Sequence, residues 1–275
     1  MRLAAVFTAV TALVCICILA GVPGNVNAES NTIDMVLIEP GVFQMGSADS
    51  EQDRDKDEVQ HEVKFTRAFY LSKYEVTQDQ WKKVMDTNPS HFKNCGDQCP
   101  VDSVSWYDAV EFCNKLSDSE GLTHCYKISG DKVGWDQSCT GYRLPSESEW
   151  EYAARAGTQS AFACGDSASC LGDVAWFADN SDNTTHQVGT KKANAWGLYD
   201  MHGNVVEWVW DYSSDYPTDA QVDPVGSSAG TFRVGRGGAS NRPAKVCRSA
   251  NRGFGPPENI DDFLGFRVAR TAPSQ

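Results

Sequence analysis

The sequence lacks the short motifs that mark several common enzyme classes. It contains no His-Glu-x-x-His and no Cys-x-x-Cys. It therefore does not indicate a zinc protease of the helix-motif type or a dithiol redox enzyme. The glycine-rich segment RVGRGG, residues 233–238, lacks the Lys-Ser/Thr ending of a nucleotide-binding loop, and a bulge at the start of a strand explains it better.

Positive charge is scarce as well. The 275 residues include 24 lysines and arginines against 37 aspartates and glutamates, which gives a formal net charge of -13. Nucleic acids and anionic membranes are bound by basic surfaces, so this balance argues against both as partners. An acidic surface is compatible with divalent cations.

The sequence also lacks any linker that would divide it. No Ser/Pro/Gly-rich stretch and no run of charge separates residues 29–275 into parts, and no internal repeat is evident. Hydrophobic residues make up 41% of the chain and there are eight tryptophans, unlike the composition of a disordered protein. We therefore predict one domain with a packed core.

Residues 1–28 resemble an export signal. The single basic residue Arg2 precedes an apolar run that ends at Val22, and the sequence Val-Asn-Ala suits cleavage before Glu29. We expect the mature chain to be periplasmic or secreted, with no membrane contact after cleavage. An uncleaved membrane anchor stays open, because the apolar run is about long enough to span a bilayer.

Two of the ten cysteines lie in this signal, and the other eight are expected to form disulfides. Short local loops favour three pairs. Cys95 and Cys99 bracket a Gly-Asp turn, Cys125 and Cys139 flank a hairpin-like segment, and Cys164 and Cys170 close a loop of small residues. The pairing of Cys113 and Cys247 is left open, and the helical spacing of apolar residues around Cys113 predicts a buried core residue.

Three helices are predicted in the first half of the chain, each after a serine or threonine that can cap it. They begin after Thr77, Ser105 and Ser146 and end before Asn88-Pro89, near Gly121 and at Gly157. We interpret Glu147, Glu149 and Glu151 as helix-start charges rather than a catalytic set.

Strand signals surround these helices. Residues 35–47 alternate around Pro40-Gly41 and predict a hairpin, and residues 61–71 alternate again. After Gly157 the chain predicts short strands joined by long irregular loops. The fold class is therefore α+β with few regular elements.

The segment GLYDMHGNVVEWVWD, residues 197–211, is the strongest site candidate. Asp200 and Glu207 supply carboxylates, and Gly203 and Asn204 favour a sharp turn that can aim oxygens at one point, as calcium requires. The alternative is a plain turn in which a buried arginine such as Arg267 holds Glu207. His202, inside the segment, is interpreted as a structural residue.

A series of motifs, taken in order, resembles the formylglycine-generating enzyme or sulfatase-modifying factor family. They are MVLIEPGVFQMGS, YEVTQDQW, PVDSVSWYDAVEFC, GYRLPSESEWEYAAR, WGLYDMHGNVVEW, GRGGAS, CRSANR and LGFRVAR. The resemblance implies a single irregular C-type-lectin-like domain over residues 29–275, with a core at about 35–270. By position it implies four calcium ligands, which are the side chains of Asp200 and Glu207 and the main-chain oxygens of Gly203 and Val205.

The resemblance also indicates a missing feature. The family's oxidases hold copper(I) between two cysteines shortly after a Gly-Gly-Ser turn, because soft thiolates suit that ion. Here the segment reads GGASNRPAKVCRSANR, so the two positions fall near Ser240-Asn241 and at Ala244, and Cys247 lies outside the match. We therefore expect no copper pair, and whether the chain is an enzyme stays open.

Three functions follow from the resemblance. We expect first an exported domain that presents residues 238–252 and 254–263 to a protein, peptide or glycan partner in the cell envelope. Its candidate contacts are Ser240, Asn241, Arg242, Arg248 and Arg252. The second hypothesis is a periplasmic oxidoreductase acting on a small metabolite, and the third is oxidation of a sulfatase cysteine to formylglycine.

Overall fold

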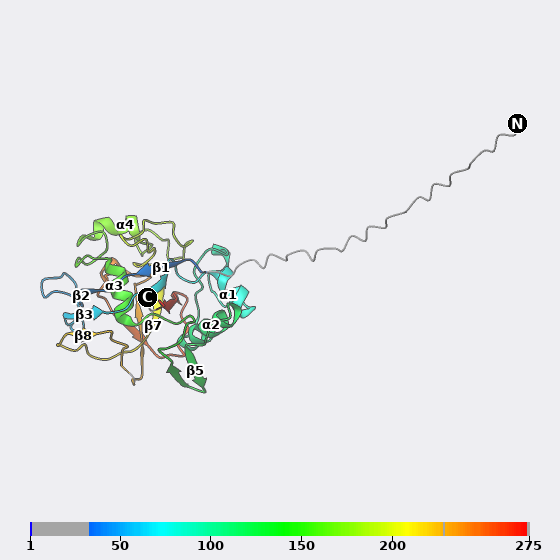
Figure 1. Cartoon of the computed structure of the whole chain (residues 1–275). Coiled ribbons are helices and arrows are strands. Elements are labelled where there is room, and N and C mark those ends of the chain that lie inside the picture. Colours follow the sequence, from blue (N-terminus) through cyan, green and yellow to red (C-terminus); the bar gives the residue numbers. More distant parts are fainter. Residues whose placement is uncertain (2–32, 228, 274–275) are drawn as a thin grey trace. The chain divides into compact units, whose positions relative to one another are not determined.

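The computed structural model describes Met1 and residues 33–227 and 229–273 (Figure 1). Apart from Met1, the export signal expected over residues 1–28 lies outside the described residues. Within them, no helix combines the length and the apolar character that crossing a bilayer requires.

Short strands and helices alternate along the described residues. The helices are α1 (Gln78–Met85), α2 (Trp106–Ser119), α3 (Glu147–Arg155) and α4 (Leu171–Val174), with single 3-10 turns at Lys93–Cys95, Ala168–Cys170 and Ala244–Val246. The strands are β1 (Met35–Ile38), β2 (Gly41–Met45), β3 (His61–Phe65), β4 (Phe69–Ser72), β5 (Tyr126–Ser129), β6 (Lys132–Trp135), β7 (Val206–Tyr212), β8 (Gln221–Val222), β9 (Arg233–Arg236), β10 (Gly253–Gly255), β11 (Leu264–Phe266) and β12 (Ala269–Thr271). The predicted α+β class with short strands and long loops is confirmed.

The three predicted helices are present as α1, α2 and α3. Each begins with a capping box, in which the N-cap hydroxyl accepts the backbone N–H three residues on and that residue's side chain accepts the N-cap N–H. The caps are Thr77, Ser105 and Ser146. The capping signal in the sequence therefore placed these helix starts correctly.

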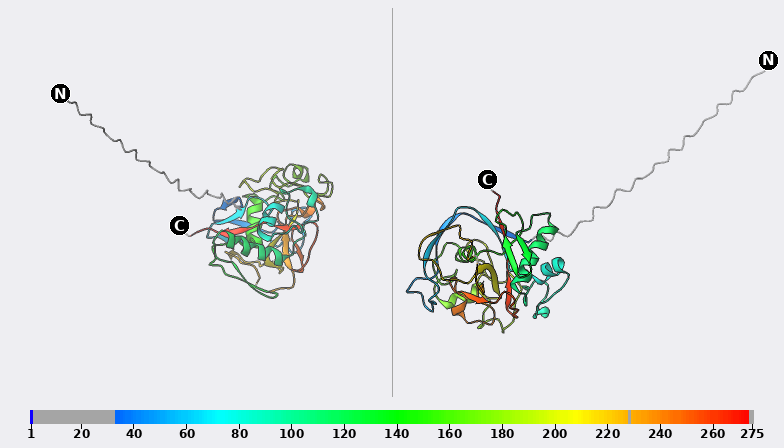
Figure 2. Two further views of the ribbon diagram at one scale, coloured as in Figure 1. Left: turned by 90° about the vertical axis from the view of Figure 1, so that its right-hand side faces the viewer. Right: turned by 90° about the horizontal axis from the view of Figure 1, so that it is seen from below.

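The strands form small sheets around these helices (Figure 2). The four-stranded sheet has the order β10-β9-β7-β11, in which β7 runs antiparallel to β9 and parallel to β11. Strand β4 lies between β1 and β12, so the first and last strands share a three-stranded sheet. The other groups are β2-β3-β8 and the hairpin β5-β6.

The prediction of a hairpin over residues 35–47 is wrong. Strand β1 pairs with β4 and strand β2 pairs with β3, in two different sheets. Alternation of apolar residues specifies that a segment is a strand but not which strand it pairs with, and Pro40 lies where the chain passes from one sheet to the other.

Helix α3 contributes Trp150, Ala153 and Ala154 to one of the hydrophobic clusters of the core. All nine of its residues are buried, and it contacts β2, β7 and β9. Trp150 is fully buried there among apolar side chains that include Val209 and Val234. The carboxylates on this helix are therefore also withdrawn from water and need partners.

The three disulfides predicted from local loops are present. Cys95 is bonded to Cys99, Cys125 to Cys139 and Cys164 to Cys170. The Cys125–Cys139 bond closes the base of the β5-β6 hairpin. The two free cysteines of the described residues, Cys113 and Cys247, are both buried.

Candidate functional site

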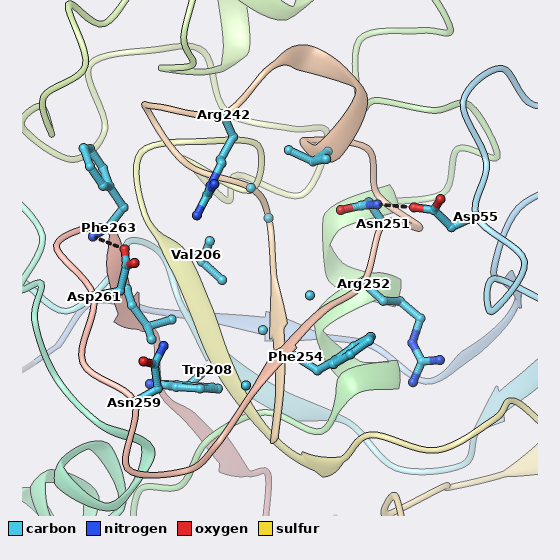
Figure 3. A pocket seen from close by; sticks show the side chains of 17 residues that line it. Asp55, Val206, Trp208, Arg242, Asn251, Arg252, Phe254, Asn259, Asp261 and Phe263 are labelled. Carbon is cyan, nitrogen blue, oxygen red and sulfur yellow. Dashed lines mark hydrogen bonds between the residues drawn. The ribbon is translucent and has the colours of Figure 1, made fainter. Parts of the chain in front are cut away.

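The two C-terminal loops that the sequence predicts as a binding surface line one pocket of about 370 Å³ (Figure 3). Val206 and Trp208 on β7 and Gly235 on β9 contribute to it from the sheet. The loops around it contribute Arg242, Val246, Asn251, Arg252, Phe254, Asn259, Asp261 and Phe263. Asp55, from a distant part of the sequence, completes the lining and accepts a hydrogen bond from the Asn251 amide at 3.1 Å.

Two glycines hold the first loop against the sheet. Gly237 and Gly238 follow β9 with φ values of +96° and +71°, which favour glycine. A Cβ atom on Gly238 would lie 2.6 Å from the sulfur of Cys247 and 2.9 Å from the carbonyl oxygen of Val246. The pocket wall therefore depends on this close backbone approach.

Arg242 is the one predicted contact residue in the pocket whose side chain is exposed. It lines the pocket, and its guanidinium group forms no ion pair or hydrogen bond within the part of the chain that the structure describes. Arg252 also lines the pocket, but its guanidinium donates to both carboxylate oxygens of Glu147, at 2.7 and 3.0 Å, and lies over the Tyr216 ring. Arg242 is therefore the available positive charge of the pocket.

The other three predicted contacts lie outside this pocket lining. Arg248 is buried and donates to Glu58 at 2.7 and 2.8 Å and to Glu51 at 2.6 Å. Its prediction as a partner contact has no support in this geometry. Ser240 is fully buried and Asn241 is half-buried, and the Ser240 hydroxyl and the Asn241 amide oxygen have no hydrogen-bond partner among the described residues.

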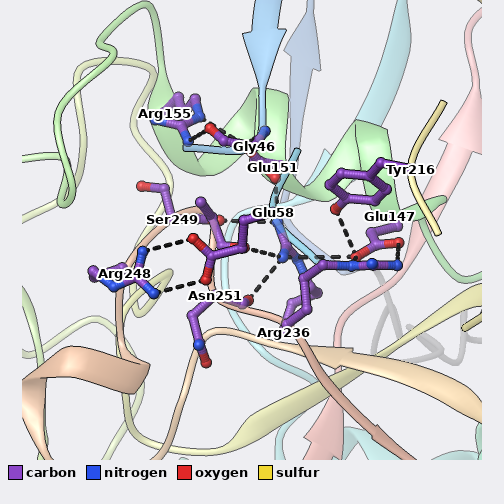
Figure 4. A network of polar contacts seen from close by, with 12 residues as sticks. Gly46, Glu58, Glu147, Glu151, Arg155, Tyr216, Arg236, Arg248, Ser249 and Asn251 are labelled. Atoms are coloured by element: carbon purple, nitrogen blue, oxygen red, sulfur yellow. Dashed lines mark hydrogen bonds and ion pairs between the residues drawn. The ribbon is translucent and has the colours of Figure 1, made fainter. Parts of the chain in front are cut away.

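The carboxylates of α3 form a buried ion-pair network (Figure 4). Glu151 accepts from Arg155 at 2.8 Å and from Arg236 at 2.5 Å, and Glu147 accepts from Arg252. Glu149 pairs with an arginine of the preceding loop as well as closing the capping box. The interpretation of these glutamates as helix-start charges was therefore incomplete, because each of them is also buried and paired with an arginine.

Within the predicted calcium turn, Glu207 is occupied by an arginine. The Nε and Nη2 atoms of Arg267 donate to its two oxygens at 2.6 and 2.7 Å, and the indole of Trp150 donates at 2.7 Å. Both side chains of the ion pair are fully buried. For Glu207, the structure shows the alternative that the sequence left open, a carboxylate held by Arg267.

Asp200 has a different environment. One oxygen accepts a hydrogen bond from the Gly189 N–H at 2.7 Å, while the other is buried and has no hydrogen-bond partner among the described residues. Burial raises the pKa of Asp200 to about 6. At Gly203, φ is +100° and a Cβ atom would lie 2.0 Å from the carbonyl oxygen of Trp176, so only glycine fits.

Sequence reasoning missed Glu75, which lies between β4 and α1. It accepts from the Val205 N–H at 3.1 Å and from the Asn204 amide at 2.7 Å. Burial, together with the nearby charges of Asp200 and Glu207, raises the pKa of Glu75 well above its usual range. Its position two residues before the helix cap Thr77 was the only sequence signal for it.

These side chains alone do not make a metal site. Across the described ranges, no three or more His, Cys, Asp and Glu side chains are grouped so that they could hold a metal ion. A cation at this turn would therefore need main-chain oxygens, such as those expected from Gly203 and Val205, as well as carboxylates.

The two free thiols lie in different hydrophobic clusters. Cys113 belongs to the cluster around α2, and Cys247 belongs to a smaller one with Phe162 and Leu171. Burial raises the pKa of the Cys247 thiol to about 12. Neither thiol is among the residues that line the pocket.

His202 is structural, as the sequence suggested. Its Nε2 accepts the Ala163 N–H at 3.0 Å, so Nδ1 carries the proton and donates to the Cys247 carbonyl at 2.8 Å. Burial lowers the pKa of His202 to about 4. The residue joins three loops rather than facing the pocket.

Comparison with known proteins shows where the chain belongs. The family model described as sulfatase-modifying factor enzyme 1-like domain matches residues 21–272. A protein of Paenibacillus barcinonensis named chaperone protein LppX is 33% identical over 86% of this chain and 89% of its own length. The formylglycine-generating enzyme of Bos taurus is 28% identical over 91% of this chain and 78% of its own length.

A solved structure agrees with this assignment. Treponema denticola variable protein 1 superposes with a TM-score of 0.78 at 34% identity, covering 86% of this chain and 95% of that one. Together with the order of the motifs and the fold described above, these similarities show that the chain belongs to the sulfatase-modifying factor enzyme 1-like domain family.

Proposed function

We propose that this chain is an exported binding protein that holds a segment of a protein or peptide partner in the pocket between its C-terminal loops. The observation that carries the proposal is the combination, in one pocket of about 370 Å³, of exposed aromatic surface with the guanidinium of Arg242, which is unpaired among the described residues. Three disulfides support an oxidising, extracytoplasmic compartment. A relative at 33% identity is named a chaperone, which agrees with a role in binding other proteins.

The lining suggests the chemistry of the partner. Phe254 is 57% exposed and its ring stacks on Phe232, with 6.2 Å between the ring centroids. An aromatic pair beside a free arginine suits a segment that carries an apolar side chain next to a carboxylate. A glycan could also stack on the aromatic rings, so the identity of the bound material is one result of the test below.

Formylglycine generation is the second candidate, and the similarity to the bovine enzyme is the observation that favours it. That chemistry in the family needs two neighbouring thiolates for copper(I). Here six of the eight described cysteines are in disulfides, and Cys113 and Cys247 lie in separate clusters. The loss of the copper pair stays a prediction that metal titration must test.

We also propose that calcium stabilises the turn of residues 197–211. One buried oxygen of Asp200 has no partner in the described part of the chain, which supports the proposal because a hard cation would satisfy it. The glycine requirement at Gly203 supports it too, since a tight turn brings main-chain oxygens together.

Site-specific photocrosslinking tests the binding proposal. A benzoyl-phenylalanine placed at Phe254 is expected to give a defined adduct in cells, and Arg242→Glu should remove it. The matched control is the same probe at Ile128, which is 44% exposed on the β5-β6 hairpin. Equal adducts from both positions, or none from Phe254, would contradict the proposal, and mass spectrometry of the adduct separates protein from glycan.

A further inference from the structure

We propose that a second pocket, built around Arg143 and Trp135, binds the carboxylate of a small acid that also carries a short apolar group. The pocket has a volume of about 210 Å³, and its walls come from the ends of β3, β6 and β12 and from the start of α3. It is lined by Phe65, Arg67, Ala68, Phe69, Trp135, Gln137, Arg143, Ser146, Glu149, Asp223, Pro224, Val225 and Thr271. None of these residues lines the pocket between the C-terminal loops, so this site is independent of the function proposed above.

Main-chain pairing fixes the walls of this pocket. Arg143 exchanges two main-chain hydrogen bonds with Ala269 of β12, of 2.9 and 2.6 Å. The carboxylate of Asp223, which directly follows β8, accepts from the N–H and the hydroxyl of Thr66 at 2.7 and 2.5 Å. These bonds hold the turn between β3 and β4 against the segment after β8. The pocket is therefore formed before any ligand binds.

The carboxylates of the lining already have partners. Glu149 accepts from the two Nη atoms of Arg143, at 2.6 and 2.7 Å, and from the Ser146 N–H at 2.8 Å. Both oxygens of Asp223 accept from Thr66. Each carboxylate oxygen in the lining thus has a hydrogen-bond donor, and Arg143 neutralises Glu149. The lining does not call for a cation.

Two buried donors of the same lining lack acceptors. Arg143 is 3% exposed, and its Nε–H has no hydrogen-bond partner among the described residues. The buried indole N–H of Trp135 has none there either. The two groups are neighbours, because the guanidinium carbon of Arg143 lies 5.0 Å from the centre of the Trp135 ring. Unpaired buried donors lower stability, so a ligand oxygen that accepts from them would bind favourably.

Arg67 supplies a positive charge for the same ligand. Its side chain is exposed, and its guanidinium forms no ion pair or hydrogen bond in the ranges that the structure describes. The charge of Asp223 is not paired with an arginine, but its oxygens are turned to Thr66. A carboxylate has two oxygens, so it can accept from the buried donors and also pair with Arg67. A neutral amide of the same shape lacks the charge that these groups favour.

The rest of the wall selects a short apolar group. Phe65 and Phe69 are 5% and 3% exposed, with 5.6 Å between their ring centroids, and Val225 is 38% exposed. A volume of 210 Å³ is below the roughly 300–1,000 Å³ of pockets that enclose drug-sized ligands. The ligand is therefore either a free small acid or the C-terminal residue of a peptide, and both present the same carboxylate.

Fluorine NMR of para-fluorobenzoate tests the proposal. We expect saturable binding with a Kd of about 1 mM or tighter, and binding roughly tenfold or more weaker for para-fluorobenzamide, which keeps the shape and lacks the charge. Competition by N-acetyl-alanyl-valine and by its C-terminal amide identifies the source of the carboxylate. Displacement by the acid but not by the amide assigns the site to a peptide terminus, and displacement by neither assigns it to a free acid.

Two variants test the lining, and a third is the control. Trp135→Phe removes the indole N–H and keeps an aromatic ring, so binding of para-fluorobenzoate should weaken about tenfold. Arg67→Ala should weaken it about two- to fivefold, as expected for an exposed charge. Lys132→Ala removes an exposed positive charge from the same hairpin, outside the lining, and should leave the Kd unchanged.

The melting temperature of each variant shows that it is folded under the conditions of the titration. Absence of saturable binding in the millimolar range would overturn the proposal. Equal binding of acid and amide by the unmodified chain would overturn it too, as would an unchanged Kd in folded Trp135→Phe.

Discussion

Arg267 and Glu207 form a fully buried ion pair with two hydrogen bonds, of 2.6 and 2.7 Å. The pair joins β7 to the residue that follows β11, the two parallel strands at the edge of the four-stranded sheet. Trp150 of α3 donates to the same carboxylate, so helix and sheet meet at this point. The pair is therefore a structural connection beneath the turn of residues 197–211.

Removing one partner of the Arg267–Glu207 ion pair should lower the free energy of unfolding. Arg267→Met leaves Glu207 buried without its cation, and we expect a loss of about 3–5 kcal/mol in the free energy of unfolding. The double variant Arg267→Met, Glu207→Leu should recover part of that loss, because no unpaired charge remains. Urea unfolding at constant calcium measures both, and a double variant less stable than Arg267→Met would contradict the assignment.

A disulfide that closes a longer loop should stabilise the folded chain more than one that closes a shorter loop. Replacing Cys125 and Cys139 by serine opens a link across 14 residues and should cost about 3 kcal/mol, whereas the Cys95–Cys99 link across 4 residues should cost about 2 kcal/mol. Urea unfolding of the two paired variants measures the difference. A larger loss for the shorter loop would show that local contacts, and not chain entropy, determine the effect.

Local signals carried most of the fold that could be predicted. The capping boxes at Thr77, Ser105 and Ser146 located three helices, and short loops located three disulfides. These features depend on residues close in the sequence. Strand pairing does not, and the segment of residues 35–47 was accordingly assigned to a hairpin although its two strands join different sheets.

The candidate site shows the same difference between features set by neighbouring residues and features set by residues far apart in the sequence. The positions of Asp200 and Glu207 in one turn were visible in the sequence, but Glu75 was missed because 125 residues separate it from Asp200. Arg248 looked like a loop contact, yet it pairs with Glu58, which is 190 positions away. Arg242 is unpaired within the described ranges, whereas Arg248 is buried in an ion pair, and this difference depends on contacts that no local pattern encodes.

The free energy of unfolding should fall in acid because the buried ring of His202 must become protonated. Its pKa is about 4 in the folded chain, below the ordinary value, so the neutral ring contributes stability that is complete above about pH 6.5 and is lost as the pH falls toward 4. The difference corresponds to about 3 kcal/mol. Burial raises the pKa of Asp211 to about 7, which acts in the opposite direction, so the comparison must be between the unmodified chain and His202→Gln. Parallel stability profiles for the two between pH 4 and 7 would refute this role.

The two free thiols should be unreactive in the folded state. Cys113 and Cys247 are both fully buried, and burial raises the pKa of each. In a chain that begins at Glu29, a thiol reagent at about pH 8 should label neither until the protein is unfolded, and should then label both. Fast labelling of Cys247 in the folded chain would show an open thiol close to the Gly237-Gly238 turn.

We propose that this member of the family uses its fold to bind a partner and does not use thiolate-bound copper. The most direct measurement is a copper(I) titration of the reduced chain against a competing chelator. We predict no stoichiometric retention of copper, because Cys113 and Cys247 lie in separate buried clusters. Tight retention of one copper ion per chain, with loss of the thiol from a sulfatase-motif peptide under air, would contradict the account.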